Sequence, residues 1–331
     1  MAIGAGIGAS LGIGVETAYG TYATPTRWTE FDKESLALEA KDVDGQGIAA
    51  GRIVEAGSQR VRTTRQAKGA VDTSVFQTGM GMWLSALMGS TAVPVQQATS
   101  TAYLQTHVLG NPNGISRTIQ MGIPDLEGVV HPYTFLGCKI TDGKLTCGVD
   151  ELVKASFTID AMDVNETETF VTPAFVTPNP EFHFAEGVVL MGAYGSEVAV
   201  AGIRKAEIDL KWTLEEQRFY FGGAGVKEEP VVNGWAAISG TLDTDLLDKT
   251  KTVDLYAANT PTSLLLTFTG PVISGSYNYE MTVHIPQIWF TGKPPEVGGP
   301  GVVQPAMSFV GRSDETNNPM TITYQSTDTT L

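Results

Sequence analysis

The sequence predicts a mainly β protein of two tandem domains, each with one α-helix. The chain has 331 residues, which is about two domains of ordinary size. Short runs that alternate Val, Ile, Phe, Thr or Tyr with polar residues lie between Gly, Pro, Asn and Asp, as in half-buried antiparallel strands. The order of these runs recurs in the second half of the chain, which indicates an internal repeat.

Residues 1–33 are expected to form a flexible arm. Residues 1–22 are rich in Gly, Ala, Ser and Thr, and they show neither a period of two nor a helical stripe. The segment GAGIGAS looks like a dinucleotide-binding fingerprint, but that motif requires a strand before it and a helix after it. Because neither can be written here, we interpret the segment as a glycine-rich arm.

The first predicted domain spans residues 34–169. A helix is predicted over residues 78–89, because Met80, Trp83 and Leu87 belong to an apolar stripe at spacings of three and four. The strand-like runs of this domain are ESLALEA, QRVRTT, AVDTSVF, AYLQTHVL, SRTIQM, YTFLGCKI, KLTCGV and LVKASFTIDA.

Two cysteines exclude a disulfide framework and any metal site that needs three or four thiolates. In GCKITDGKLTCG, the Asp142-Gly143 pair predicts a two-residue hairpin turn. Such a turn places Cys138 opposite Cys147, where a cross-strand disulfide is geometrically possible. In a reducing cytosol the favoured interpretation is two reduced, small apolar residues on one face.

Residues 170–203 are expected to connect the domains, because Pro173, Pro178 and Pro180 oppose regular structure. The second predicted domain spans residues 204–331. Its strand-like runs are IRKAEIDLKW, GWAAISGTLD, SLLLTFTG, YEMTVHIP, IWFTG, VVQPAMSFVG and PMTITYQS, and TDLLDKTKTVDLYAAN is its helical segment.

The two halves agree in the order of their elements. Each has a strand, a long Gly-containing excursion, a strand, one helix, two strands and a final hairpin. LVKASFTIDAMD can be aligned with VQPAMSFVGRSD, shifted by one residue, so that Phe157 lies opposite Phe309. The length differences fall in loops, where insertions concentrate. We therefore interpret the chain as one domain written twice.

Composition excludes several classes of protein. The chain has 36 acidic and 21 basic residues and a net charge of −15, which opposes binding to nucleic-acid phosphates. No run approaches the roughly 18 apolar residues of a membrane-spanning helix. The first twelve residues lack the basic start and long apolar stretch of a signal peptide, so we expect a soluble protein that is not exported by the general route.

No motif for catalysis, metal binding or cofactor binding is found. His107, His131, His183 and His284 lie far apart in the sequence and do not have metal-ligand spacing. Residues 42–45 look like the start of a calcium loop but lack its later oxygen ligands. Nucleophile elbows, phosphate loops and C-x-x-C pairs are missing from the sequence. We therefore expect a protein that is not an enzyme and has no catalytic residue, metal site or cofactor.

One segment has an unusual local charge. GRIVEAGSQRVRTTRQAKG has a single acidic residue, Glu55, against five basic ones, which are Arg52, Arg60, Arg62, Arg65 and Lys68. A solvated hairpin is the ordinary interpretation. The alternative is an inter-ring or intersubunit contact, in which this basic block meets an acidic strip on a neighbouring copy. The candidate residues for such a strip are Asp243, Asp245 and Asp248.

The amino-terminal sequence GIGVETAYGTYATPTRWTEFDKESL resembles the opening of major tail tube proteins of long-tailed, non-contractile (siphovirus-type) bacteriophages. The matching positions are Gly14–Glu16, Tyr19–Thr21, Pro25–Trp28 and Glu34–Leu36. The basic segment, the FQTGMGMWLSALMG helix and the closing IPQIWFTGK…VVQPAMSFVGR…NPMTITYQS pattern extend the resemblance over nearly the whole chain.

This resemblance implies a structural virion protein. In the family, each tube domain is a β-sandwich or partial barrel with one flanking α-helix, so the resemblance implies two tandem domains of this kind. Tube domains join their inner sheets into rings, and the rings stack into a tube with an early hairpin, here residues 41–69, reaching the next ring. It implies a pseudo-hexameric ring of three duplicated chains, or a hexamer. It also implies an acidic lumen that DNA crosses without specific binding, and contacts with the tape measure, tail terminator and baseplate or distal tail proteins. The location implied is the virion tail, assembled in the host cytoplasm, with no membrane contact.

Two functions of other classes stay open. A β-rich virion or surface adhesin would bind a glycan through exposed aromatic residues and would not form filaments. A β-sandwich hydrolase would use carboxylates that are scattered in the sequence but adjacent in the fold. Rings or tubes of the purified protein would distinguish the tube protein from both.

Overall fold

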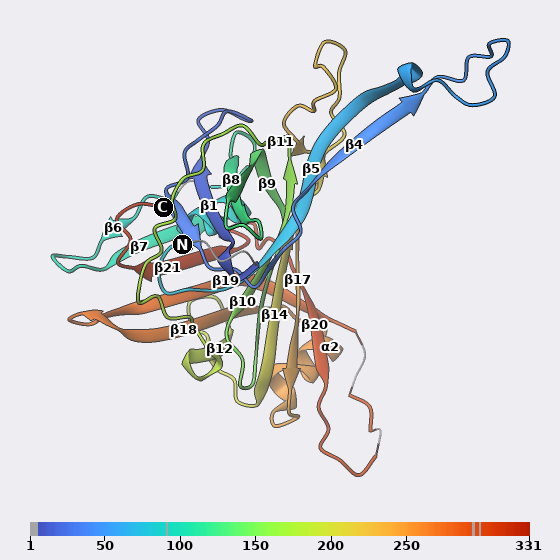
Figure 1. Ribbon diagram of the computed structural model, residues 1–331. Helices are drawn as coiled ribbons and strands as arrows, with labels where there is room; N and C mark the ends of the chain where they lie inside the picture. The colour runs from blue at the N-terminus through green and yellow to red at the C-terminus, as the bar shows by residue number, and fades with distance from the viewer. Residues whose placement is uncertain (1–5, 91, 293–294, 298) are drawn as a thin grey trace.

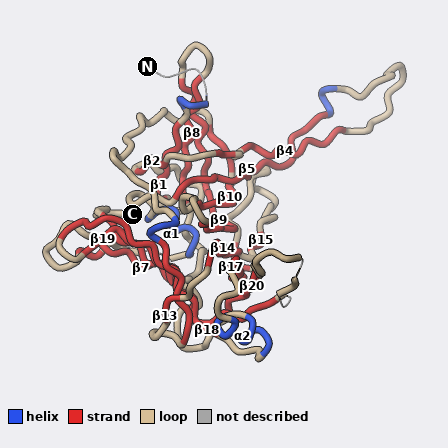
Figure 2. The backbone as a smooth tube through the Cα atoms, turned by 90° about the horizontal axis from the view of Figure 1, so that it is seen from below, coloured by secondary structure: helices blue, strands red, loops and turns tan. Residues whose placement is uncertain are grey.

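The computed structural model describes residues 6–331 except 91, 293–294 and 298. Figure 1 shows a β-rich body from which one long hairpin projects, and Figure 2 shows how few helices accompany the strands. The prediction of a mainly β fold with large antiparallel sheets is confirmed. Within the described residues, no helix is both long and apolar enough to cross a membrane.

Eight antiparallel strands form the main sheet. In spatial order they are β4 (Ala37–Asp44), β5 (Arg60–Ser74), β10 (Lys154–Ala161), β9 (Val130–Gly148), β14 (Ile203–Lys211), β17 (Ala237–Thr244), β20 (Ala306–Gly311) and β19 (Tyr277–Thr291). The β9–β14 pair joins the first half of the chain to the second, so the sheet is continuous across both halves.

The main sheet has one apolar face and one polar face, because residues two apart on a strand share a side. One row across the sheet is buried and consists of Thr73, Ala155, Leu145, Ile208, Gly240, Phe309 and Phe290. The adjacent row consists of Ser74, Lys154, Thr146, Glu207, Thr241, Ser308 and Thr291, and of these only the polar Ser74 is buried. The core therefore lies on one side only.

Two smaller antiparallel layers extend from the long strands of the main sheet. The first adds β8 (Arg117–Pro124), β1 (Ser10–Val15) and β2 (Arg27–Thr29) to the start of β9. The second adds β18 (Thr262–Ser274), β12 (Gly187–Gly192) and β13 (Val198–Ala199) to β19. The pairings of the first half thus recur in the same order in the second.

The remaining strands are short or lie beside these layers. β21 (Thr321–Ser326) pairs with β19 and with β7 (Tyr103–Val108), which also pairs with β6 (Val95–Gln96). β11 (Asp163–Asn165) pairs with β9, and β3 (Lys33–Glu34) pairs with β5. β15 (Leu214–Glu215) and β16 (Val231–Val232) pair with each other in the excursion between β14 and β17.

The helix predicted over residues 78–89 is confirmed as α1 (Gly81–Met88), and all of its residues are buried. Gly89 ends it with a φ of 62°, which a residue without a side chain adopts at little cost. Trp83 stacks on Phe157 with ring centroids 5.0 Å apart, which fixes the helix on the sheet. The second helix, α2 (Val253–Ala257), occupies part of the predicted helical segment.

The prediction of a flexible amino-terminal arm is wrong for the residues that the structure describes. β1 pairs with β2 and β8, and Leu11 and Ile13 are completely buried. The glycines of this strand face crowded surroundings: a Cβ on Gly12 would lie 2.8 Å from the side chain of Pro25, and one on Gly14 would lie 2.8 Å from the carbonyl oxygen of residue 23. Residues 1–5 of the predicted arm lie outside the described residues.

The segment predicted as a connection also contains structure. Residues 187–199 form β12 and β13 in the second small layer. Upstream, Phe182 is fully buried, and its amide donates to the carbonyl of Val75 over 2.9 Å. The prolines lie in irregular chain between 170 and 181, so only that part lacks extended regular structure.

The hairpin turn predicted at Asp142-Gly143 is also wrong. β9 continues through both residues, because β10 and β14 pair with it on its two sides. Cys138 and Cys147 are therefore on one strand, and both are buried free thiols.

Candidate functional site: the projecting hairpin and its base

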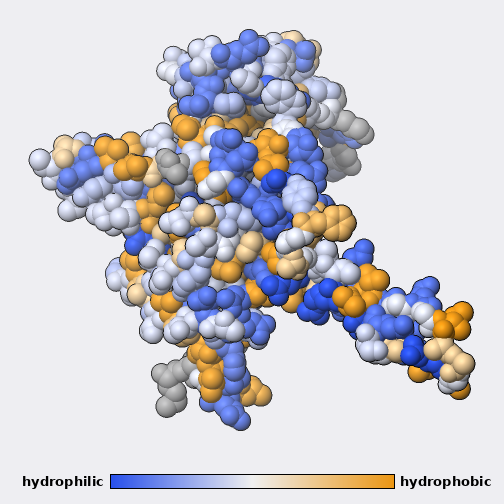
Figure 3. Space-filling model, turned by 90° about the horizontal axis from the view of Figure 1, so that it is seen from above, coloured by the Kyte–Doolittle hydropathy of each residue, from blue (hydrophilic) through white to orange (hydrophobic). Residues whose placement is uncertain are grey.

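The hairpin of β4 and β5 is exposed along most of its outer part, and it projects well beyond the body in Figures 1 and 2. Its tip, residues 45–59, has three nearly naked apolar side chains. Ile48, Ile53 and Val54 have exposed fractions of 103%, 98% and 77%. Figure 3 shows apolar surface at this end. Large apolar side chains that cluster on an exposed loop mark an interaction surface, so the tip is a candidate contact surface.

The charges on the stem of the hairpin are paired within the chain. Arg60 and Arg62 lie 3.0 and 3.1 Å from the carboxylate of Asp42 on the opposite strand. Hydrogen bonds from Arg62 and Arg60 hold the pKa of Asp42 below its ordinary value. At the tip, Arg52 donates to Gln59 over 3.3 Å. The stem is therefore close to locally neutral.

The base of the hairpin is held by ion pairs to the body. Arg65 lies 2.8 Å from Asp163, and Lys68 lies 2.5 Å from Glu216 and 3.6 Å from Asp160. Burial disfavours the charge on Lys68, but its two acidic neighbours outweigh this and raise its pKa. The five predicted site residues are thus distributed along the hairpin, from tip to base.

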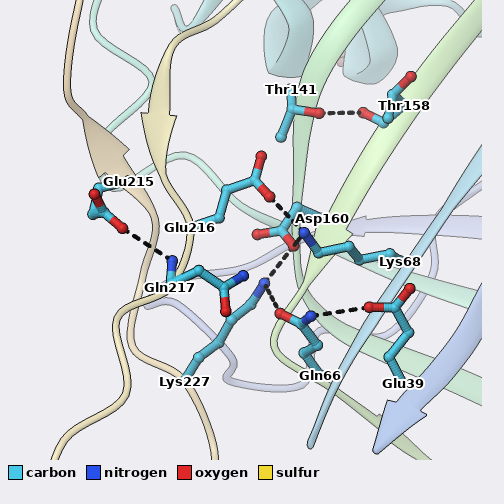
Figure 4. Close-up of polar contacts among 10 residues, drawn as sticks. All are labelled: Glu39, Gln66, Lys68, Thr141, Thr158, Asp160, Glu215, Glu216, Gln217 and Lys227. Atoms are coloured by element: carbon cyan, nitrogen blue, oxygen red, sulfur yellow. Dashed lines mark hydrogen bonds and ion pairs between the residues drawn. The ribbon is translucent and has the colours of Figure 1, made fainter.

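A buried lysine completes the base. Figure 4 shows Lys227 reaching Asp160 beneath Lys68, while Gln66 bridges Lys227 and Glu39. The side chains of Lys227 and Asp160 are 0% and 2% exposed. Burial lowers the pKa of Lys227 and raises that of Asp160, since low polarity disfavours both charges.

Lys227 belongs to the excursion between β14 and β17, residues 212–236, which lies against the base of the hairpin. The amide of Arg65 donates to the carbonyl of Gly225 over 2.9 Å. The same excursion exposes Tyr220, Phe221 and Trp235. Sequence reasoning missed this contact, and its only signal was the length of a Gly-rich insertion at the same place in the repeat as the hairpin.

The acidic candidates lie at the other end of the sheet. By register, Asp243 belongs to the row of Gly148, Lys205 and Ala306, at the end opposite to the tip of the hairpin. This row borders a depression of about 420 Å³. Asp245 accepts a hydrogen bond from Gln304 over 2.8 Å, and Asp248 caps Thr250 over 2.9 Å. The sequence-predicted basic and acidic groups do not meet within one chain.

The polar face of the main sheet combines hydroxyl groups with lysines that have acidic neighbours. Lys144 lies 2.5 Å from Glu207, and Lys205 lies 3.6 Å from the same carboxylate. Lys154 lies 2.6 Å from Asp32. Each of these three lysines is only partly exposed and lies within ion-pair distance of a carboxylate, with Lys144 and Lys205 sharing that of Glu207.

One cluster outside the hairpin has catalytic residue types. Ser263, His284 and Glu197 are within hydrogen-bond distance of one another, and these bonds lower the pKa of Glu197 to about 2 although burial opposes its charge. The same nitrogen, Nε2 of His284, contacts both partners, at 3.1 Å for the serine and 2.8 Å for the glutamate. In a catalytic Ser-His-acid triad the serine and the acid contact different nitrogens of the imidazole ring, so this cluster is structural. Within the described residues, no group of three or more His, Cys, Asp or Glu could hold a metal ion.

A β-rich chain with an open main sheet and projecting apolar loops defines a structural protein built to contact other chains. The sequence matches the family model of the phage tail tube protein over residues 6–316. The chain therefore belongs to the phage tail tube protein family and is a structural protein of the virion tail. This is a structural family and not an enzyme family. None of the curated proteins compared with the chain matches it.

Proposed function

We propose that the chain is the major tail tube subunit of a long-tailed, non-contractile phage, and that its copies close into rings that stack into the conduit for genome delivery. The observation that carries this proposal is the family match together with the open main sheet. Within the described residues, β4 has a partner strand on one side only. An open sheet edge promotes pairing with another chain, and closure into a ring removes it.

The chain supplies two ring positions in this proposal. The recurrent pairings support reading it as two tube domains, with β1 and β12 as their first strands, earlier than the predicted boundaries at 34 and 204. Three chains then make a pseudo-hexameric ring. A ring of six chains is the alternative, and ring symmetry in electron micrographs separates the two.

Stacking would use the two ends of the sheet. The apolar tip of the hairpin and Arg52 would contact the next ring near the depression beside Asp243. Arg60, Arg62, Arg65 and Lys68 would act mainly by stiffening the hairpin, because each is within ion-pair distance of a carboxylate of its own chain. A stiff projection loses less conformational entropy when it docks.

The polar face of the main sheet is the candidate lining of the lumen. Its Ser and Thr hydroxyls and its acid-paired lysines offer DNA phosphates few free cations. The expected acidic lumen is thereby refined to a charge-balanced one that still avoids specific DNA binding. Contacts with the tape measure, tail terminator and distal tail proteins, and assembly in the host cytoplasm, remain part of the proposal by family membership.

Negative-stain microscopy of the purified protein tests this function. We expect rings and tubes, and we expect Ile48→Ser/Ile53→Ser/Val54→Ser to give rings that fail to stack. Leu126→Ser, which changes another apolar side chain that is 93% exposed, is the matched control and should leave tube length unchanged. Discrete globular particles at every concentration would overturn the proposal, and a glycan-dependent binding activity of such particles would favour an adhesin.

A further inference from the structure

In the main sheet, the pairing of β9 with β14 joins the two halves of the chain, and two neighbouring copies of the chain could pair in the same way. Its strand order consists of two quartets, β4-β5-β10-β9 and β14-β17-β20-β19. Corresponding strands occupy corresponding places, and the last strand of the first quartet pairs with the first strand of the second. The pattern therefore predicts how the last strand, β19, would meet β4 of another copy.

The registers fix which residues correspond. A bulge lies at the same point in both halves: Arg117 and Cys138 pair before it in one, and Thr262 and Ile288 pair before it in the other. Two residues beyond Cys138 and Ile288, each long strand pairs with the next strand of its quartet, at Ile159 and Phe309 respectively. Phe309 therefore corresponds to Ile159, two residues away from the Phe157 match expected from the sequence.

Glycines confirm this correspondence on the neighbouring strands. Ile159 pairs with Gly69, and Phe309 pairs with Gly240. Across from these glycines lie Leu36 and Ile208, since a Cβ on Gly69 would be 2.6 Å from the Cα of Leu36 and Gly240 pairs with Ile208. Counting onward, Leu38 corresponds to Leu210 and Glu39 to Lys211.

On the long strands the pairings relate Asp142 to Thr291, because a bulge at Thr141 gives β9 one more residue after Ile140 than β19 has after Phe290. Asp142 pairs with Thr158 of β10, and Thr291 pairs with Ser308, its counterpart on β20. One residue further along the chain, Gly143 corresponds to Gly292. The sequences agree at this point, Asp-Gly in one half and Thr-Gly in the other.

The outer edge of β4 has the features of a strand edge that lacks its partner, as judged from the described residues. Leu210 is 1% exposed within the β9–β14 joint, whereas its counterpart Leu38 is 42% exposed. The amide of Ser35 donates into the sheet, to the carbonyl of Ala70, so the amide of Leu36 points out of the edge. That amide donates to the carboxylate of Glu34 over 2.8 Å, so the Glu34 side chain occupies the position where a neighbouring strand would pair.

We propose that β19 of one copy pairs antiparallel with β4 of the next, with Thr291 opposite Glu39 and Gly292 opposite Leu38. This inference rests on the proposed ring function and repeats the internal pairs Asp142–Lys211 and Gly143–Leu210. The parity is right, because Glu39 pairs with the polar-face residue Gln66 and Leu38 with the buried Ala67. If the register between β19 and β4 shifted by one residue, apolar positions of one strand would lie opposite polar positions of the other.

Engineered disulfides test the register. The amide of Trp212 donates to the carbonyl of Thr141, so the neighbouring Asp142–Lys211 pair is a non-hydrogen-bonded rung. On such rungs the Cα atoms approach to about 4.5 Å, within disulfide range. We expect Thr291→Cys/Glu39→Cys to give a covalent ladder that ends at three chains on non-reducing gels. Thr291→Cys/Lys41→Cys, displaced by two residues, should crosslink about ten-fold less because its Cα atoms are too far apart.

Two controls keep the outcomes distinct. Asp142→Cys/Lys211→Cys should form a disulfide within a single chain, and mixing the separate Thr291→Cys and Glu39→Cys variants should give covalent dimers only. Rings in micrographs without a disulfide at Glu39, or with one preferentially at Lys41, would overturn this register and leave the ring function intact. The absence of rings from the wild-type protein would overturn both.

Discussion

The buried ion pair at the base of the hairpin gives the sharpest prediction for stability. Lys227→Met removes the ammonium and leaves the carboxylate of Asp160, which is 2% exposed, with Lys68 at 3.6 Å as its remaining cation. Breaking a buried pair on one side typically costs about 3–5 kcal/mol. Since Lys68 retains part of the attraction, we expect a loss near the lower limit, about 3 kcal/mol.

Urea unfolding of unassembled protein, followed by tryptophan fluorescence, measures this loss. The double variant Lys227→Met/Asp160→Asn removes both charges and should recover at least about 1 kcal/mol of it, because no buried charge is left unpaired. Lys249→Met is the matched control, since Lys249 lies 3.1 Å from Asp254 but is 69% exposed. It should cost less than about 1 kcal/mol. Equal losses for the buried and the exposed lysine would refute the reasoning.

Three further predictions concern the body of the protein. Burial lowers the pKa of His107 to about 4, so the unfolded chain binds the proton first as pH falls. Stability should therefore decline between about pH 6.5 and 4, by up to roughly 3 kcal/mol, and His107→Gln should flatten that decline in urea titrations. Gly240→Ala would place a Cβ 2.2 Å from a carbonyl oxygen of the adjacent strand and should lower the free energy of unfolding by about 1–3 kcal/mol, whereas Gly57→Ala, with open space around it, should not. Burial raises the thiol pKa of Cys138 and Cys147, so a thiol reagent should label neither in the native protein and both in urea; labelling without urea would contradict their burial.

The sequence predicted those elements whose signal is local. The apolar stripe and terminal glycine of α1 describe a helix without reference to the rest of the chain. Alternation in LVKASFTIDA predicted β10, because one face of that strand is buried and the other is not. Such patterns reflect burial directly, so they survive the absence of tertiary information.

The errors came from residues whose role depends on distant neighbours. Asp142-Gly143 has the residue types of a tight turn, but β10 and β14 pair with these residues on both sides and keep them in an extended strand. A Cβ on Gly143 would lie 2.3 Å from Leu87 of α1. The glycines of β1 look like a flexible arm, although they lie in close contact with neighbouring residues while Leu11 and Ile13 fill the core. In both places glycine marks crowding, which a local pattern cannot separate from flexibility.

The candidate site was predicted in the same partial way. The five basic residues of the hairpin were recognised as a cluster, but their partners were not. The partners of Arg65 and Lys68 lie far along the chain, and Asp42 meets Arg60 and Arg62 only through the register of the hairpin. Lys227 had no signal at all, since one lysine in a loop carries no pattern. Its importance follows only from the fold, which lays the excursion of the second half on the hairpin of the first.

The hairpin and the excursion also affect how rings of this protein would stack. The two halves project unlike loops from the same end of the sheet: a long hairpin with an aliphatic tip and a shorter excursion with exposed aromatic rings. In a ring of three chains the long and short projections alternate around the rim. Successive rings are then equivalent after rotations of one third of a turn but not of one sixth, so each ring would have three equivalent ways to dock on the next, where a ring of six identical domains would have six.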